Sequence, residues 1–277
     1  MLLGGIAAVS VLIAVAFGFG FDAFADLSWL WMMPAVFVGA FLVLLVIAFL
    51  FLYFACKRVD LDVPQEHDSA FYRKMTYLYI DALILLVGLR VHTRGLENTP
   101  KDGRFMLVCN HQHLADPVLL LGFFKKSQLA FISKQENRDM FIIGKLMHRL
   151  MCQTLDRDND RQALKTILKC IQLVKDDEVS IGVFPEGYTS KDGKLHHFRS
   201  GVFKIAQKAN VPIVVCTIQG TREIFHNMAR LKPTDVQLHL VGVIPAEDLK
   251  GKTAVEIGER AHRMMADDMG PDLVAEA

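Results

Sequence analysis

The chain has 277 residues and a mass of 31.1 kDa, enough for one or two domains with a sizeable core. Apolar residues make up 52% of it and its mean hydropathy is +0.29, which excludes a disordered chain and a purely soluble one. Its 31 basic and 30 acidic residues nearly cancel, so bulk charge gives no reason to expect a nucleic-acid partner.

The N-terminal part reads as a membrane anchor. Residues 1–21 and residues 27–56 contain no charged side chain. A helix needs about twenty apolar residues to cross a bilayer, so both segments are long enough. We therefore predict an anchor of two transmembrane helices over residues 1–56.

The residues around the two apolar segments predict how they are oriented. Lys57 and Arg58 directly follow the second segment, and the positive-inside rule places such residues in the cytoplasm. Trp29 and Trp31 lie near the turn at residues 22–26, as aromatic residues do at a membrane interface. The N-terminus and the body of the chain are then cytoplasmic, and the turn is external.

A cleaved signal peptide is the alternative for the first segment. Ala23-Phe24-Ala25 has the form of an A-x-A cleavage site. Against cleavage, the segment has no basic n-region, Asp22 adjoins the site and a second apolar segment follows. We therefore expect both segments to be retained.

A connector follows at residues 57–92. Its apolar run, residues 76–91, is interrupted by Asp81, Gly88 and Arg90, and it is too short to span a bilayer. We expect a helix that lies in the membrane interface or docks on the body, with a buried core helix as the alternative.

Residues 93–277 should form an α/β body, because apolar runs typical of buried strands alternate with helical patterns. The expected strands are at 105–109, 129–133, 179–184, 211–218 and 236–243. The expected helices begin at 116 and cover 137–151, 160–175, 201–209 and 253–269. Strands separated by helices predict a mostly parallel sheet covered by helices on both faces.

Charge and cysteine content add two expectations for this body. Residues 101–210 hold 18 basic and 12 acidic side chains, which suits an anionic substrate or membrane surface, or simply a solvated face. The five cysteines are odd in number and form no C-x-x-C pair, which argues against disulfides and a zinc cluster and fits a reducing compartment.

The first candidate site is the segment Asn110-His111-Gln112-His113-Leu114-Ala115-Asp116-Pro117, which follows an expected strand. Loops after strands of a parallel sheet line the crevice where ligands bind. His111 is a natural general base, and Asp116 can orient it if His111 lies in the loop and Asp116 at the helix start. Alternatively, Asp116 is only an N-cap before Pro117 and His111 an ordinary loop residue.

The second candidate is Phe184-Pro185-Glu186-Gly187-Tyr188-Thr189-Ser190, after another expected strand. Its loop should open on the same edge of the sheet. Gly187 allows close backbone approach and supplies an unhindered amide, and Glu186 is placed to bond a substrate hydroxyl. A plain strand-to-helix turn is the alternative for this segment taken alone.

Together these segments resemble the glycerolipid acyltransferases, the lysophosphatidic acid acyltransferase family. His111 and Asp116 look like its HxxxxD block, and Phe184–Ser190 is similar to its FPEGTRS block. Three further features fit in order over about residues 90–245: Lys134 after a short strand, Leu155-Asp156-Arg157 after Gly144, and Val211-Pro212-Ile213-Val214. N-terminal membrane anchors also fit this family.

The resemblance implies transfer of a fatty acyl group from acyl-CoA or acyl carrier protein to a lysophospholipid hydroxyl. It implies 1-acylglycerol-3-phosphate as the acceptor and phosphatidic acid as the product, with another lysophospholipid or glycerol phosphate as alternatives. His111 and Asp116 would be catalytic, and no metal or cofactor would be needed. Lys134, Arg157, Glu186 and Gly187 would bind the substrate, with the guanidinium of Arg157 on the phosphate.

One departure from the family pattern bears on the acceptor. The usual Thr-Arg of the FPEGTRS block is Tyr188-Thr189 here, so the arginine assigned to phosphate is missing. Arg199, Lys194 and Lys134 are nearby cations that can replace it. The headgroup of the acceptor is therefore less constrained than the reaction.

Two other functions compete with acyl transfer. A metal-dependent hydrolase is suggested by His111-x-His113 with Asp116 and the downstream pair His196-His197, because His-x-His is a real metal-ligand spacing. The HxHxDH pattern of such hydrolases is not met, however, since the aspartate comes one residue late. A non-catalytic membrane scaffold would leave the histidine and aspartate without a use.

Overall fold

The computed structural model describes residues 1–156 and 159–275. By its internal contacts the chain divides into two compact units, Met1–Val63 and Pro64–Ala277. Each unit is described by itself below. The three-part division expected from the sequence stays a prediction.

The first unit is a helical hairpin of α1 (Leu2–Gly20) and α2 (Trp29–Lys57). Its helices are long and apolar enough to cross a membrane, by length and composition. Only 28% and 6% of their most apolar stretches are buried, which is not the pattern of core helices in a soluble protein. This unit therefore points to membrane association.

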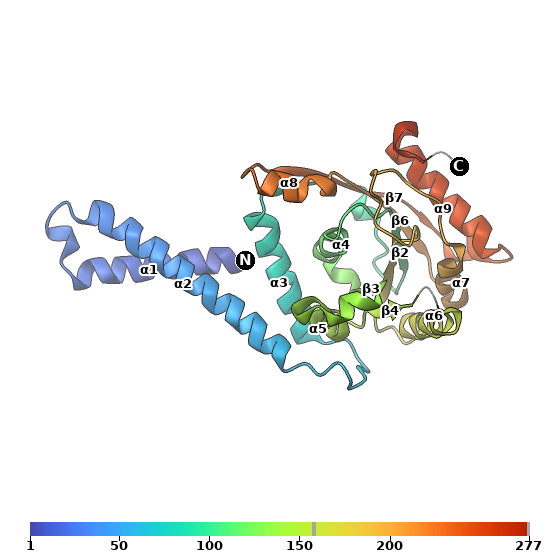
Figure 1. The fold of residues 1–277 in the computed structure, drawn as a ribbon, viewed down its shortest axis with the longest axis horizontal. Coiled ribbons are helices and arrows are strands. Elements are labelled where there is room, and N and C mark those ends of the chain that lie inside the picture. The colour runs from blue at the N-terminus through green and yellow to red at the C-terminus, as the bar shows by residue number, and fades with distance from the viewer. Residues whose placement is uncertain (157–158, 276–277) are drawn as a thin grey trace. The chain divides into compact units, whose positions relative to one another are not determined.

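The second unit is built on a sheet (Figure 1). Its strands are β1 (Leu89–Arg94), β2 (Met106–Cys109), β3 (Leu129–Lys134), β4 (Gln153–Leu155), β5 (Ser180–Val183), β6 (Ile213–Gln219) and β7 (Thr234–Ile244). Within the described residues they form one seven-stranded sheet in the order β1-β7-β6-β2-β5-β3-β4. Every pair is parallel except β6 with β7, so the predicted α/β fold with a mostly parallel sheet is confirmed.

Helices cover both faces of this sheet (Figure 1). They are α3 (Ala70–Leu86), α4 (Asp116–Phe123), α5 (Phe141–Arg149), α6 (Asp160–Lys175), α7 (Lys204–Ala209), α8 (Ile224–Met228) and α9 (Ala254–Met269). Alternate residues of β2 point to opposite faces, as the two-residue period of a strand requires. Met106 and Val108 join the core beneath α6, α7 and α9, whereas Leu107 and Cys109 join the core beneath α4.

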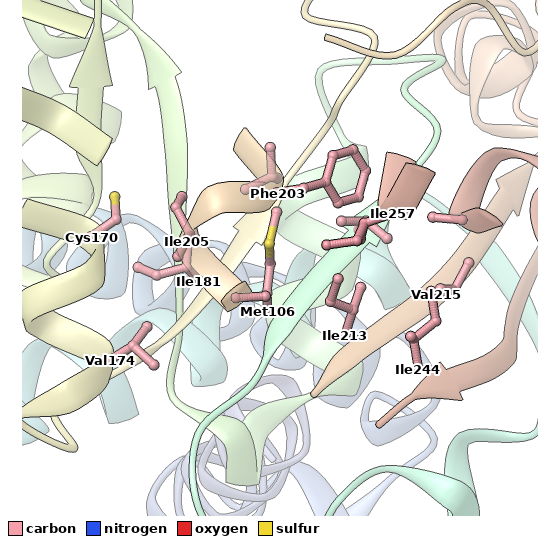
Figure 2. Close-up of a cluster of buried hydrophobic side chains, with 14 of the residues drawn as sticks. Met106, Cys170, Val174, Ile181, Phe203, Ile205, Ile213, Val215, Ile244 and Ile257 are labelled. Carbon is pink, nitrogen blue, oxygen red and sulfur yellow. The ribbon is translucent and has the colours of Figure 1, made fainter. Parts of the chain in front are cut away.

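Figure 2 shows the first of these two cores. Met106, Ile181 and Ile213 come from three neighbouring parallel strands and meet side chains of the covering helices, including Phe203 and Ile257. All five are nearly or fully buried. Packing of this kind fixes the strand ends, and therefore the loops that follow them.

Helix α3 is docked on the body, one of the alternatives expected for this segment. Arg73 is buried and pairs with Asp68 at 2.6 Å. Its guanidinium also donates to the carbonyl oxygens of Leu129 and Leu150, which ties α3 to the start of β3 and the end of α5. The expected helix over 76–91 was wrong at its end, because Gly88 turns the chain with φ +69° into β1.

Most expected elements are observed. The helix predicted for residues 160–175 has those bounds, and the expected strands match β2, β3, β5, β6 and β7 within two residues at each end. The sequence reasoning missed β1 and β4, which lie among polar or mixed residues, and it missed that β7 runs antiparallel to β6. A strand's direction depends on tertiary packing and leaves no local pattern.

Candidate active site

His111 and Asp116 meet at the carboxyl end of β2. His111 lies in the loop after Cys109, and Asp116 is the first residue of α4. The Nδ1–H of His111 donates to Oδ2 of Asp116 at 2.8 Å, so the contact predicted from the loop-and-helix arrangement is confirmed. Because Nδ1 is occupied, Nε2 is the ring atom left to accept a proton.

The backbone around Asp116 fixes this carboxylate in place. Its side chain is 0% exposed, and Oδ2 also accepts the N–H groups of Gln112 and His113, both at 2.7 Å. The helix has Ala115 at its N-cap position, so the expectation of Asp116 as the N-cap was one residue off. The carboxylate thus caps its own loop and holds the imidazole at the same time.

Glu186 joins the two candidate loops. One carboxylate oxygen accepts the N–H of His111 at 2.9 Å and the other accepts the N–H of His196 at 3.1 Å. The N–H of Ser190 donates in turn to the carbonyl of His111 at 2.8 Å. The two segments therefore do open on the same edge of the sheet and are bonded to each other.

Burial of Glu186 changes what it can do. The residue is 1% exposed, and burial raises the pKa of its carboxyl to about 7. Each of its two oxygens accepts one backbone N–H group, and the predicted bond from Glu186 to a substrate hydroxyl stays a prediction. The contacts are those of a residue that positions the loop carrying His111.

The backbone amide of Gly187 differs from what the sequence predicted. Its N–H donates to the carbonyl of Phe184 at 3.0 Å, so this amide is not the unhindered donor that the sequence suggested. Its φ of +81° is a conformation that favours glycine. A Cβ at this position would lie 3.1 Å from both Cδ and Nε of Arg199. Gly187 therefore makes room for the arginine side chain.

Asn110 and Gln112 support the histidine loop, a part that sequence reasoning missed. The side-chain amide of Asn110 donates to the carbonyl of Ile218 at 2.9 Å, and its oxygen accepts the Ile218 N–H at 2.7 Å. Gln112 donates to the carbonyl of Gly193 at 2.9 Å. The signal available in the sequence was two amide side chains that flank the histidine directly after an expected strand.

An apolar cavity of about 390 Å³ is lined in part by Phe184, a neighbour of His111. The Phe184 ring stacks on the His111 imidazole, with ring centroids 4.1 Å apart, and it also lines the cavity. The walls are largely aliphatic and come from β3, β4, β5 and α6, including Ile132, Leu164 and Ile167. Arg199, Lys204 and Asp160 are its charged lining residues. An apolar chain with an anionic end fits this lining.

The cations proposed for phosphate lie in different places. Lys134 is exposed at the carboxyl end of β3, on the edge of the sheet that carries His111. Arg199 lies over Gly187, and among the described residues its side chain has no carboxylate partner. Arg157, the third candidate, lies outside the described residues. The structure thus brings the side chain of Arg199 to the glycine of the second loop.

The ligands of the metal-site alternative are not brought together. His113 Nδ1 accepts the Ala115 N–H, its ring packs against Phe225, and burial lowers its pKa. His196 pairs with Asp192 at 2.9 Å. Over residues 1–156 and 159–275, no three His, Cys, Asp or Glu side chains are placed to hold a metal ion.

Known proteins resemble this chain over the same region. Residues 90–219, from β1 to the end of β6, match a family model described as Acyltransferase. A probable 1-acyl-sn-glycerol-3-phosphate acyltransferase of Mycoplasma pneumoniae is 29% identical over 180 residues, which cover 64% of this chain and 66% of that protein. A chloroplastic 1-acyl-sn-glycerol-3-phosphate acyltransferase of Brassica napus, BAT2, is 34% identical over 158 residues, covering 55% and 45%.

A solved structure extends the likeness to most of the chain. The crystal structure of the 1-acyl-sn-glycerophosphate (LPA) acyltransferase PlsC from Thermotoga maritima superposes with a TM-score of 0.60 at 25% identity. The match covers 80% of this chain and 88% of that one. The aligned region spans less than two thirds of the length of the Mycoplasma and Brassica relatives.

Proposed function

Because residues 90–219 match the Acyltransferase family model, we propose that the chain transfers a fatty acyl group from acyl-CoA or acyl carrier protein to 1-acyl-sn-glycerol-3-phosphate. The product is phosphatidic acid. The observation that supports this most is the His111–Asp116 pair, held by backbone bonds at the strand edge beside an apolar cavity. The names of the relatives and of the similar solved structure agree with it.

The arrangement of His111 provides the proton chemistry for this reaction. Nε2 takes the proton of the acceptor hydroxyl as its oxygen attacks the thioester carbonyl carbon, and the resulting imidazolium is stabilised by Asp116. The tetrahedral intermediate then collapses, the C–S bond breaks, and His111 returns the proton to the leaving thiolate. An ester and a free thiol result, and no covalent enzyme intermediate is required.

The acceptor's phosphate needs a cation near the second loop. Arg199 supports this part of the proposal, since its guanidinium lies at Gly187 and suits phosphate geometry. Lys134 is a second candidate at the same sheet edge, and Arg157 stays a prediction. The aliphatic lining of the cavity suits an acyl chain of either substrate.

We also propose how the chain is oriented in the membrane. We place α1 and α2 across a bilayer, with Lys57 and Arg58 cytoplasmic and the turn at residues 22–26 external. Cysteines introduced at Asp26 and at Lys57, in a Cys56→Ser background, should react differently with an impermeant thiol reagent on intact cells. Labelling at 26 but not at 57 is expected, and the reverse pattern would overturn this orientation.

The decisive assay uses purified full-length protein. Acyl-CoA and acyl carrier protein donors are each combined with lysophosphatidic acid, with lysophospholipids lacking a phosphate monoester, and with glycerol 3-phosphate. Phosphatidic acid should form fastest, and added EDTA should not reduce the rate. A preference for an acceptor without a phosphate monoester would contradict the acceptor but keep the chemistry, and loss of activity with EDTA would favour the metallohydrolase.

A further inference from the structure

We propose that the second unit has its own membrane-docking surface, an apolar lip formed by six side chains beside the histidine loop. They are exposed apolar residues from three separate segments: Leu85, Leu86, Leu114, Phe225, Met228 and Leu231. The occupant is the interfacial region of a bilayer with anionic lipids. This inference does not depend on the proposed reaction.

Two contacts bring the three segments of the lip close together. The N–H of Thr234 donates to the carbonyl of Gly88, which joins the end of α3 to the loop after α8 (Figure 1). On the other side, the Phe225 ring lies 4.6 Å from the His113 ring, so α8 adjoins the loop that carries Leu114. The lip thus extends from the end of α3 to within three residues of His111.

Leu231 is the most exposed member. It is 95% exposed, and its φ of +54° places a bulky apolar residue in the left-handed region. Exposure to water contributes no favourable free energy for a leucine side chain. The left-handed conformation is also unfavourable for a residue with a Cβ. A side chain held outward in this way at a loop tip gains free energy only when something apolar covers it.

The charged residues around the lip favour a bilayer with anionic lipids as the surface that the lip contacts. Exposed Arg230 and Lys232 flank Leu231, and Arg222 precedes α8, whereas Glu223 is the one acidic residue over 221–233. Long basic side chains beside apolar ones are the composition of interfacial segments on anionic membranes. Residues 58–69 also connect this unit to α2, which is long and apolar enough to span a bilayer.

Fluorescence quenching in lipid tests the lip without an activity measurement. The native tryptophans are changed by Trp29→Phe and Trp31→Phe, and Leu231→Trp provides a single reporter in the full-length chain. The protein is placed in phosphatidylcholine–phosphatidylglycerol nanodiscs with brominated acyl chains. Val255→Trp is the matched control, because Val255 is 53% exposed on α9, which covers the other core.

If the lip enters the bilayer, the fluorescence of the tryptophan at 231 should be blue-shifted and quenched by the bromines. The fluorescence of the tryptophan at 255 should be neither shifted nor quenched. No quenching at 231, or equal quenching at both positions, overturns the proposal. Absence of quenching would instead point to a protein as the cover. This outcome is distinct from failure of the acyltransferase proposal, which changes turnover and leaves the quenching as expected.

A second measurement applies if the chain is an acyltransferase. Leu231→Glu removes the most exposed apolar group of the lip without touching the His111–Asp116 pair. The KM for long-chain lysophosphatidic acid in a bilayer should rise about tenfold. The KM for a short-chain, monomeric acceptor should stay unchanged. Equal effects on both acceptors would contradict a membrane role for the lip.

Discussion

Two histidine–aspartate pairs in the second unit have nearly the same geometry and different surroundings. His111 contacts Asp116 at 2.8 Å and His239 contacts Asp268 at 3.0 Å, in each case through Nδ1. The histidines are 17% and 18% exposed, and both carboxylates are buried. Neither distance nor burial therefore tells a candidate catalytic pair from a structural one.

The partners of the two carboxylates do differ. Asp268 accepts hydrogen bonds from the Thr217 hydroxyl and the Arg94 guanidinium as well as from His239, so its charge is already shared. Asp116 accepts only backbone N–H groups besides His111 among the described residues, and no cation pairs with it. An imidazolium at position 111 would receive the full stabilisation of its carboxylate.

Location separates the pairs further. His239 lies within β7 and its partner Asp268 lies in α9, so the contact fastens a helix to the sheet. His111 lies in a loop at the carboxyl end of a parallel strand, next to a cavity. Near it, Arg199 keeps its charge available, whereas Arg94 is bound to Asp268. A histidine–aspartate pair is useful for chemistry where the fold leaves both the base and a cation accessible.

The largest effect on activity should come from removing His111, the general base at the carboxyl edge of the sheet. His111→Ala is expected to lower kcat for acyl transfer by about 10²–10⁴, the usual loss of a general base. The protein should still fold and bind membranes. Steady-state kinetics of the purified variant measures this, and turnover like that of the wild type would refute the assignment. His113→Ala, which does not contact Asp116 through its ring, is the control and should retain more activity.

Glu186 should make the stability of the site depend on pH. Its pKa is raised from 4.5 to about 7 by burial, so the folded state prefers the protonated carboxyl. The free energy of unfolding should therefore fall by roughly 3 kcal/mol as pH rises from about 4.5 to about 7. Thermal unfolding of wild type and Glu186→Gln across this range tests it, because the variant should lose this slope. Parallel Tm profiles would contradict the prediction.

Removing the guanidinium of Arg199 should weaken binding of the acceptor specifically. A charge-assisted bond to phosphate contributes about 1.5–3 kcal/mol, so Arg199→Ala should raise the KM for lysophosphatidic acid about 10- to 150-fold. The KM for the acyl donor should change much less, and Arg199→Lys should recover part of the loss. Lys204→Ala is the matched control, since Lys204 lines the same cavity but does not lie against Gly187. Equal losses in both alanine variants would refute a specific phosphate contact.

The smallest effect is expected at the structural pair. His239→Ala should leave kcat and KM unchanged and lower the free energy of unfolding by about 1 kcal/mol, because Asp268 keeps Thr217 and Arg94 as partners. Chemical denaturation and the acyl-transfer assay measure the two quantities on the same preparation. A loss of activity comparable to that of His111→Ala would remove the distinction between the pairs.

Much of the fold followed from local patterns. The helix at residues 160–175 was readable from its apolar face, and the core strands from short apolar runs, because helix and strand periods are properties of the chain itself. The His111–Asp116 contact could also be predicted, because a histidine in the loop five residues before the Asp-Pro that begins the helix lies close enough to reach the aspartate. Their catalytic role stays a prediction.

Other features were decided only by the tertiary structure. Only the tertiary structure shows that Glu186 is buried and that its two oxygens each accept a backbone N–H group, one from each of two loops. Arg199 is twelve residues from Gly187 in the chain, yet it lies against it because Arg199 N–H bonds to the carbonyl of Pro185. Sequence determined which residues can do chemistry. Long-range contacts determined which of these residues are available for chemistry, because a buried polar group forms its hydrogen bonds with neighbouring groups of the protein.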